Sequence, residues 1–426
     1  MTEIINYAGV VFLAALILYM LVLIFGALSE GRLARVGAAA EGERLRAQID
    51  LVMAEHRYTR DLKELSWQGW RKFEVARKDP EGGDICSFYL APHDNRPLPP
   101  FNPGQFLTFQ LNVPGQRKPV IRCYSLSDTP GIPENYRVSI KRVPPPRDKP
   151  DVPAGLSSNF FHDSINEGDI LDLKAPGGAF YLDMSKNTPV VLIGGGIGLT
   201  PVLSMVNAII LSGSRREAHF FYGVRNGAEH IMKDHLKTID RENPNIHMHI
   251  CYSSAKDDEV EGEDYQHAGR VGVDLFKEVL ESNNYDYYMC GPPPMMTSLT
   301  EGLAEWGVPD ANVHFEAFGP ATVKKTKTEA NKEAVEASSA SAGVKITFAK
   351  SGKTLDWDPD IGSILDFAEE NDIDIDFGCR AGNCGTCITA IKSGEVNYLN
   401  EPGAETEAGS CLACISVPKG NLSIDA

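Results

Sequence analysis

Positive charge is scarce in this sequence of 426 residues, which has 41 Lys and Arg against 58 Asp and Glu and a formal net charge of −17. A nucleic acid would be repelled by such a chain, so the composition excludes a nucleic-acid binder. The chain is also too long for one hydrophobic core, and we expect several domains.

A disulfide framework is lacking as well. The nine cysteines are an odd number, and they gather toward the C-terminus instead of being spread along the chain. This distribution favours a reducing compartment in which thiolates bind metal.

Charge is absent from residues 8–28, AGVVFLAALILYMLVLIFGAL, a run of 21 residues. About 20 apolar residues cross the hydrocarbon layer, so the run predicts a transmembrane anchor within residues 1–30. No Lys or Arg precedes it, whereas Arg32 and Arg35 follow closely. The positive-inside rule therefore predicts a single-pass protein of the inner (cytoplasmic) membrane with its catalytic domains in the cytoplasm. A cleaved signal peptide fits less well, because it would have a basic start.

The next two segments differ in periodicity. Residues 31–66 carry Leu45 and Ile49 at helical spacing among charges, which predicts a juxtamembrane amphipathic helix. From Trp67 short β-rich runs broken by Gly and Pro follow one another. They predict an antiparallel β-barrel over residues 67–185.

The remaining chain predicts two further domains and a linker. Residues 186–320 alternate apolar strands with helical stretches, which indicates an α/β domain with a parallel sheet. Residues 321–343 lack aromatic side chains and are rich in Ala, Lys, Glu and Ser, as a linker is. A compact domain, residues 344–426, begins with the alternating VKITFA.

The last domain contains Cys379-x4-Cys384-x2-Cys387, with Cys414 further on. Four thiolates at this spacing are typical of a plant-type 2Fe-2S cluster. A structural zinc site is the alternative, but zinc ribbons pair two short Cys-x-x-Cys knuckles. Residues 344–426 therefore resemble plant-type ferredoxins, which implies an α+β β-grasp fold. The resemblance favours Cys414, which ISVP follows, over Cys411 as the fourth ligand.

Two groups of motifs lie upstream. RCYS, from Arg122, ends an apolar strand, and GLSS, from Gly155, follows a Pro-rich loop. GGGIGLTP, from Gly194, follows VVLI and opens a helix, so its backbone N–H groups can cradle a pyrophosphate. CGP, from Cys290, and EAFGP, which contains Phe318, come later.

The order and spacing of these motifs resemble flavohaemoglobin-type reductase domains, of the ferredoxin-NADP reductase-like class. The resemblance covers residues 67–320 and implies that Arg122 meets a flavin phosphate, Tyr124 stacks on the isoalloxazine and Ser125 reaches flavin N5. It places Cys290 beside the nicotinamide, and Cys290 and Ser125 are the predicted catalytic residues. A buried core thiol is the alternative for Cys290. The predicted cofactor-binding residues are Arg122, Tyr124, Ser125, Gly155, Ser157, Ser158, Phe318, Gly195, Gly196, Gly198, Thr200, Pro201, Gly291 and Pro292.

No globin domain precedes Trp67, so nitric-oxide dioxygenation is not implied. With the ferredoxin last, the domain order resembles phthalate dioxygenase reductase. That relative uses FMN, but GLSSNFFHD is more similar to FAD-binding relatives, so FAD is expected and FMN is the alternative. NADH is expected over NADPH, although Arg225, or Arg215 and Arg216, could hold a 2′-phosphate.

The sequence thus predicts a multidomain, membrane-anchored NAD(P)H-dependent reductase. Electrons would pass from NAD(P)H through FAD to the 2Fe-2S cluster and on to a membrane-bound oxygenase, hydroxylase or desaturase. One alternative is an NADH dehydrogenase that feeds a quinone or an ion-pumping complex. The other is a non-enzymatic redox sensor or scaffold. The sequence leaves the electron acceptor unnamed.

Overall fold

The computed structural model describes most of the chain after residue 55 and a few earlier residues. The described residues are 13, 16–25, 45–46, 49, 52–53, 56–131, 133–145, 151–318, 343–380, 382, 384–399, 402–404 and 406–426. They belong to two units, residues 1–64 and residues 65–426.

The first unit corrects the prediction of a membrane anchor. Residues 16–25 and 56–65 are helical, but no helix in the described part of the chain has the length and apolarity that a membrane span requires. The expected transmembrane helix and single-pass location in the inner membrane are therefore contradicted. The rest of the predicted span, and much of 31–66, lies outside the described residues.

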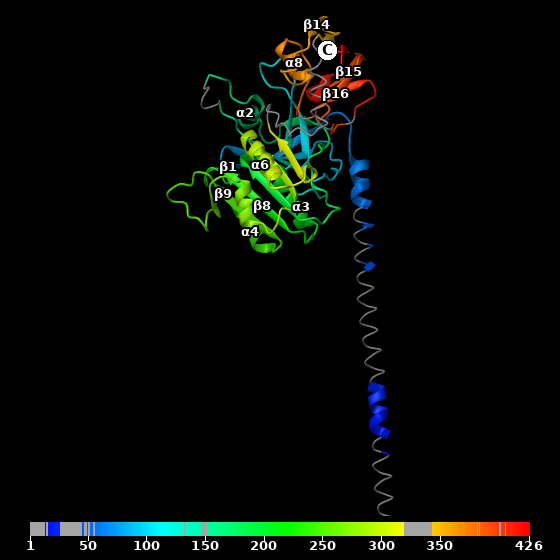
Figure 1. The fold of residues 1–426 in the computed structure, drawn as a ribbon, viewed down its shortest axis with the longest axis vertical. Helices are drawn as coiled ribbons and strands as arrows, with labels where there is room; N and C mark the ends of the chain where they lie inside the picture. The colour runs from blue at the N-terminus through cyan, green and yellow to red at the C-terminus, as the bar shows by residue number, and fades with distance from the viewer. Residues whose placement is uncertain are drawn as a thin grey trace, which may run out of the picture. The chain divides into compact units, whose positions relative to one another are not determined.

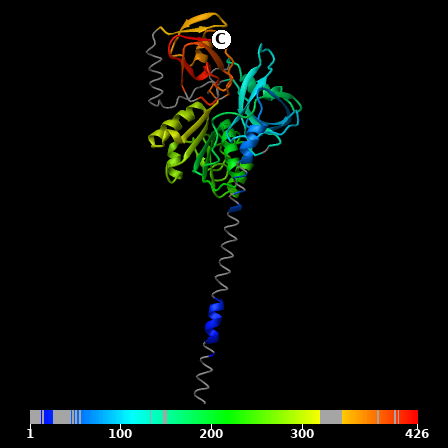
Figure 2. The same cartoon turned by 90° about the vertical axis from the view of Figure 1, so that its right-hand side faces the viewer.

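The second unit begins with a six-stranded antiparallel sheet in the order β4-β3-β6-β1-β2-β5. Along β1 buried and exposed residues alternate, because successive side chains of a strand point to opposite faces. A bridge between Leu126 and Val138 joins the two edges, so the sheet curves back on itself (Figure 2). The elements are β1 (Arg71–Gly82), β2 (Ile85–Pro92), β3 (Phe106–Leu111), β4 (Val120–Ser125), β5 (Tyr136–Lys141), α2 (Leu156–Asp163) and β6 (Ile170–Leu173).

A parallel sheet follows, in the order β10-β9-β8-β7-β11-β12. The described strand residues of β7, VVLIGG, are all buried, as expected for a sheet covered on both faces. Residues of α3 and α4 belong to one apolar cluster and residues of α5 and α6 to the other. Figure 1 labels α3, α4 and α6 beside strands β8 and β9 of this sheet. The elements are β7 (Val190–Gly195), η1 (Gly196–Gly198), α3 (Leu199–Leu211), β8 (Ala218–Val224), α4 (Lys233–Glu242), β9 (Ile246–Tyr252), β10 (His267–Ala268), α5 (Val273–Val279), β11 (Asp286–Gly291), α6 (Pro293–Glu305), η2 (Asp310–Asn312) and β12 (Val313–Ala317).

The last part has a mixed five-stranded sheet, β14-β13-β19-β15-β17, and a small pair, β16-β18. Its helix α8 starts at a capping box in which Ser363 and Asp366 each accept a backbone N–H of the other. The elements are β13 (Lys345–Phe348), β14 (Lys353–Asp356), α8 (Ile364–Glu370), β15 (Ile388–Ser393), β16 (Val396–Tyr398), β17 (Ser410–Leu412), η3 (Ala413–Ile415), β18 (Ser416–Pro418) and β19 (Leu422–Ile424). The predicted linker, residues 321–343, lies outside the described residues except for Gly343.

Candidate flavin, nucleotide and iron-sulfur site

The RCYS motif forms the end of β4, which pairs with β3. Tyr124 packs edge-on against Phe109 and Phe161, with ring centroids 5.6 and 5.2 Å away. The Arg122 guanidinium donates a hydrogen bond of 2.6 Å to the carbonyl of Ile121. Burial lowers the pKa of Arg122, so a neighbouring anion would offset the cost of burying this cation.

The GLSS motif begins α2. The Ser158 hydroxyl donates to the carbonyl of Gly155 at 3.2 Å. The Ser157 hydroxyl is buried and has no hydrogen-bond partner in the part of the chain that the structure describes. A buried donor without an acceptor is costly, and a flavin phosphate would supply the acceptor. Residues 155–158 thus fit the group that the sequence predicted there.

The glycine-rich loop connects β7 to α3 through η1. Gly196 has φ of +56°, which glycine adopts without strain. A Cβ on Gly198 would lie only 2.2 Å from the carbonyl oxygen of Cys290, so this loop and the end of β11 pack backbone to backbone. Thr200 is buried and donates its hydroxyl to the carbonyl of Ile197 at 3.1 Å. The glycines of this loop carry no side chains that would cover its backbone N–H groups. A pyrophosphate can therefore approach these N–H groups at the start of α3.

Three predicted residues lie near this loop. Gly291 ends β11, and a Cβ there would lie 3.2 Å from the Cα of Gly195. Pro292 is the residue before α6. Pro201 is buried in the first turn of α3. Phe318 is half-buried and packs against the apolar cluster that contains Cys290.

Cys290, Ser125 and Glu316 come together from three strands. Cys290 on β11 lies opposite Glu316 on β12. The Ser125 hydroxyl donates to Oε2 of Glu316 at 3.4 Å. Burial raises the pKa of the Cys290 thiol and raises the pKa of the Glu316 carboxyl to about 8. Near pH 7 the thiol is therefore uncharged and most of Glu316 is protonated.

Glu316 is a site residue that the sequence analysis missed. Its signal was its position two residues before Phe318 in EAFGP, a motif that the analysis read only for its aromatic residue. The parallel pairing of β11 with β12 brings its carboxyl beside Cys290, which the order of residues along the chain does not reveal.

The four predicted cluster ligands lie in two pairs. The backbone N–H of Cys379 donates to Sγ of Cys384 at 3.2 Å, and the N–H of Cys384 donates to Sγ of Cys379 at 3.3 Å. Sγ of Cys387 lies 3.1 Å from Sγ of Cys414. Cys411 is buried on β17, where it pairs with Thr389. Four sulfurs with N–H groups directed at them fit a 2Fe-2S cluster.

Several contacts join the ferredoxin part to β4 and its loop, among them a cation–π contact in which the Arg122 guanidinium lies 5.7 Å from the centroid of the Phe377 ring. The Cys123 thiol is hydrogen-bonded to the sulfur of Cys384, and this bond raises the pKa of Cys123. Lys118 forms an ion pair with Asp374. Cys123 follows Arg122 directly, so the predicted flavin motif touches a predicted cluster ligand.

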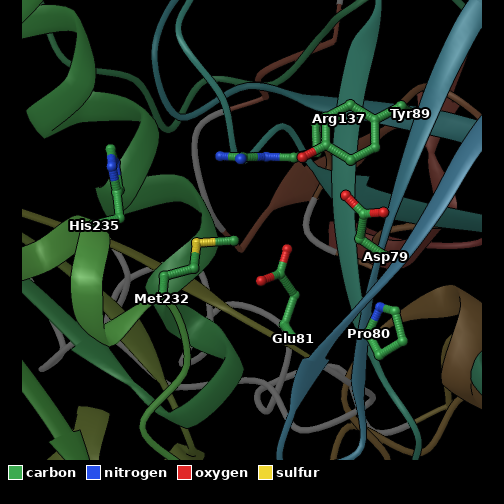
Figure 3. Close-up of a pocket in the computed structure, with 7 residues that line it drawn as sticks. All are labelled: Asp79, Pro80, Glu81, Tyr89, Arg137, Met232 and His235. Atoms are coloured by element: carbon green, nitrogen blue, oxygen red, sulfur yellow. The ribbon is translucent and has the colours of Figure 1, made fainter.

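The cavity of about 530 Å³ shown in Figure 3 lies elsewhere on the second unit. Its barrel side includes Glu81, Tyr89 and Arg137, and its other side is formed by Met232 and His235 at the start of α4. None of the residues predicted for flavin, nucleotide or cluster lines it. The predicted flavin, nucleotide and cluster sites are therefore located by the contacts among their motif residues, and this cavity is not part of them.

Comparison with known proteins identifies two domains. Residues 192–301 match the oxidoreductase NAD-binding domain, and residues 346–419 match the 2Fe-2S iron-sulfur cluster binding domain. Flavohemoproteins of Bordetella pertussis and Rhizobium meliloti are 40% and 42% identical over 255 and 254 residues, which are 59% and 60% of this chain. The chain spans 61% and 62% of those relatives' lengths.

Two solved structures resemble different extents of the chain. The FAD/NAD-binding domain of the Vibrio cholerae nitric oxide dioxygenase is 28% identical and covers 59% of this chain and 99% of its own, with a TM-score of 0.52. Phthalate dioxygenase reductase, a modular structure for electron transfer from pyridine nucleotides to [2Fe-2S], is 26% identical. It covers 84% of this chain and 98% of its own, with a TM-score of 0.51.

These matches confirm the coarse predictions. The chain combines an NAD-binding oxidoreductase domain with a C-terminal 2Fe-2S ferredoxin domain and has the architecture of an NAD(P)H-dependent oxidoreductase, and these domains support the expected cofactors FAD, NADH and a 2Fe-2S cluster. The site residues and the domain boundaries stay predictions that rest on the geometry described above.

Proposed function

We propose that the protein is a reductase that carries electrons from NADH through FAD to its own 2Fe-2S cluster and on to an oxygenase component. The contact between Cys123 and Cys384 carries this proposal, because it joins the strand of the flavin motif to a cluster ligand. Phthalate dioxygenase reductase, which matches over both parts of the chain, supports it.

Each predicted group of residues has a separate task. Arg122 and the unpartnered hydroxyl of Ser157 hold the flavin phosphates, and Tyr124 offers its ring to the isoalloxazine. The glycine-rich loop binds the pyrophosphate of NADH through backbone N–H groups. Bound flavin accepts a hydride and releases single electrons, whereas the cluster carries one electron at a time.

Cys290, Ser125 and Glu316 surround the position where hydride moves. The uncharged Cys290 thiol excludes water and adds no negative charge beside the nicotinamide. Glu316, protonated near pH 7, holds a proton within reach of Ser125. Ser125 can then donate or accept a hydrogen bond at flavin N5, as the site requires in the oxidised and reduced states.

Two of the three arginines that could hold a 2′-phosphate are paired within the protein, which supports NADH over NADPH. Arg225 is paired with Glu229 at 2.6 Å. Arg216 is buried and donates to the carbonyl of Asp183 at 3.0 Å. Both are therefore engaged within the protein, and neither is free to pair with a 2′-phosphate.

Anaerobic stopped-flow mixing with NADH tests the proposal. We expect flavin bleaching first, then an electron paramagnetic resonance signal of the reduced cluster, and NADPH should act more slowly. Purified dioxygenase components, added singly, should reoxidise the cluster. A cluster that stays oxidised while the flavin is reduced would refute the proposed path, and rapid reoxidation by a quinone alone would favour an NADH dehydrogenase.

A further inference from the structure

Four histidines and a glutamate form a polar cluster near the amino ends of the parallel strands. His219 on β8 is paired in register with His247 on β9, and His249 and His267 lie further along β9 and β10. Gly223, the partner of Gly195 in the glycine-rich loop region, is four residues along β8 from His219. At about 3.3 Å per residue the cluster is about 13 Å along the strand from that loop.

Three members of the cluster are arranged as metal ligands. Glu217, His219 and His247 each offer a ligand atom, and these atoms all lie within 4.8 Å of one another. Oε1 of Glu217 lies 3.1 Å from Nε2 of His219. Two ligands bound to one zinc at about 2.0–2.1 Å are about 3.3 Å apart in a tetrahedron, so small movements of the exposed His247 would complete the set.

A second layer of groups orients the central imidazole. Nδ1 of His219 lies 3.1 Å from Nε2 of His249. Nδ1 of His249 lies 3.1 Å from Nε2 of His267. A metal-bound histidine usually gives its other N–H to such an acceptor, which fixes the ring and raises its basicity. His219 is buried and cannot turn away, so its Nε2 faces Glu217.

We propose that Glu217, His219 and His247 bind Zn²⁺. Two imidazole nitrogens and one carboxylate oxygen suit zinc, whereas Mg²⁺ and Ca²⁺ prefer oxygen ligands alone. A water molecule would take the fourth position, on the side of the exposed His247. The ion would link β8 to β9 and brace this end of the nucleotide-binding sheet.

Zinc binding would also reset the hydrogen bonds between the histidines. Without metal, Nε2–H of His219 donates to the Glu217 carboxylate, so Nδ1 of His219 accepts from Nε2–H of His249. Nδ1 of His249 in turn accepts from Nε2–H of His267. With zinc on Nε2 of His219 that proton is lost, and Nδ1–H now donates to His249. His249 in turn donates to His267, which takes one proton from solvent at Nδ1. The three imidazoles stay neutral in both states.

Equilibrium dialysis tests the site in the full chain with flavin and cluster bound. At micromolar Zn²⁺ we expect the protein to bind about one zinc per chain more than the His247→Gln variant binds. We also expect zinc to raise the melting temperature of the protein. Mg²⁺ should give neither effect. His247→Gln, at an exposed position, should weaken zinc binding at least tenfold and abolish the rise in melting temperature.

Two further variants separate the site from zinc held elsewhere. His93→Gln, an exposed histidine outside the cluster, should keep full zinc binding. His249→Gln should weaken zinc affinity by about 10- to 100-fold, as expected for a group behind a ligand. Zinc binding that is unchanged in His247→Gln, or equal losses in His247→Gln and His93→Gln, would overturn the proposal.

Discussion

Replacing Gly198 by alanine should disable the nucleotide site without unfolding the barrel or the ferredoxin. The new Cβ would lie 2.2 Å from the carbonyl oxygen of Cys290, whereas ordinary contact begins at 3.4 Å. The loop and the end of β11 must therefore separate by 3.4 − 2.2 = 1.2 Å. Overpacking of this kind costs about 1–3 kcal/mol, and a displacement of about 1 Å can slow a reaction about 100-fold.

Stopped-flow reduction of the flavin by NADH measures this effect, with flavin content as a check on folding. We expect a rate lowered by about 100-fold and near-normal flavin. Gly272→Ala in the same domain is the control, because its Cβ would meet nothing closer than 4.0 Å. A Gly198→Ala protein that reduces its flavin at the normal rate would refute the backbone-to-backbone packing of loop and strand.

Three other predictions concern single side chains. Cys384→Ser should lose the cluster and the ability to reduce cytochrome c, but it should keep its flavin and the ability to reduce ferricyanide. Cys411→Ser should keep the flavin, the cluster and both activities. Equal losses in the two variants would contradict the ligand assignment. Cys290→Ala should slow flavin reduction by about tenfold at unchanged flavin content, and an unchanged rate would return this thiol to a structural role. For Glu316 the folded protein favours the protonated form, so the contribution of this group to apoprotein stability should be full below pH 4.5 and should be lost as pH rises through about 8. Glu316→Gln should remove that fall in thermal melts, and an unchanged slope would show that another group causes it.

The sequence predicted the order of domains because each has its own periodicity and its own motifs. The signals are local: short β-rich runs follow Trp67, the apolar strand VVLI precedes the glycine-rich loop, and the Cys379-x4-Cys384 spacing marks the ferredoxin domain. The matches to the NAD-binding and 2Fe-2S domains agree with them. The membrane anchor expected from the apolar run at residues 8–28 is contradicted, because no helix in the described part of the chain is long and apolar enough to span a membrane.

What the sequence could not predict depends on pairs of residues that are distant in the chain. Glu316 meets Ser125 across 191 positions, and Lys118 meets Asp374 across 256. The histidine cluster depends on the register of β8 with β9, which places His219 beside His247. Such contacts follow from strand order and register, and single-sequence patterns carry no direct signal for either.

Strand β4 carries residues of both proposed redox sites: Tyr124 of the flavin motif, and Cys123, whose thiol contacts the predicted cluster ligand Cys384. Neighbouring side chains of a strand face opposite ways, so Tyr124 and Cys123 serve different sides of the same strand. A shift of β4 by one residue in its pairing with β3 would turn each of these side chains to the opposite face of the strand. Tyr124 would then leave the proposed flavin site, and Cys123 would lose its contact with Cys384. A chimera that exchanges the ferredoxin domain for another should therefore carry over the β4 residues that contact it, Arg122 and Cys123.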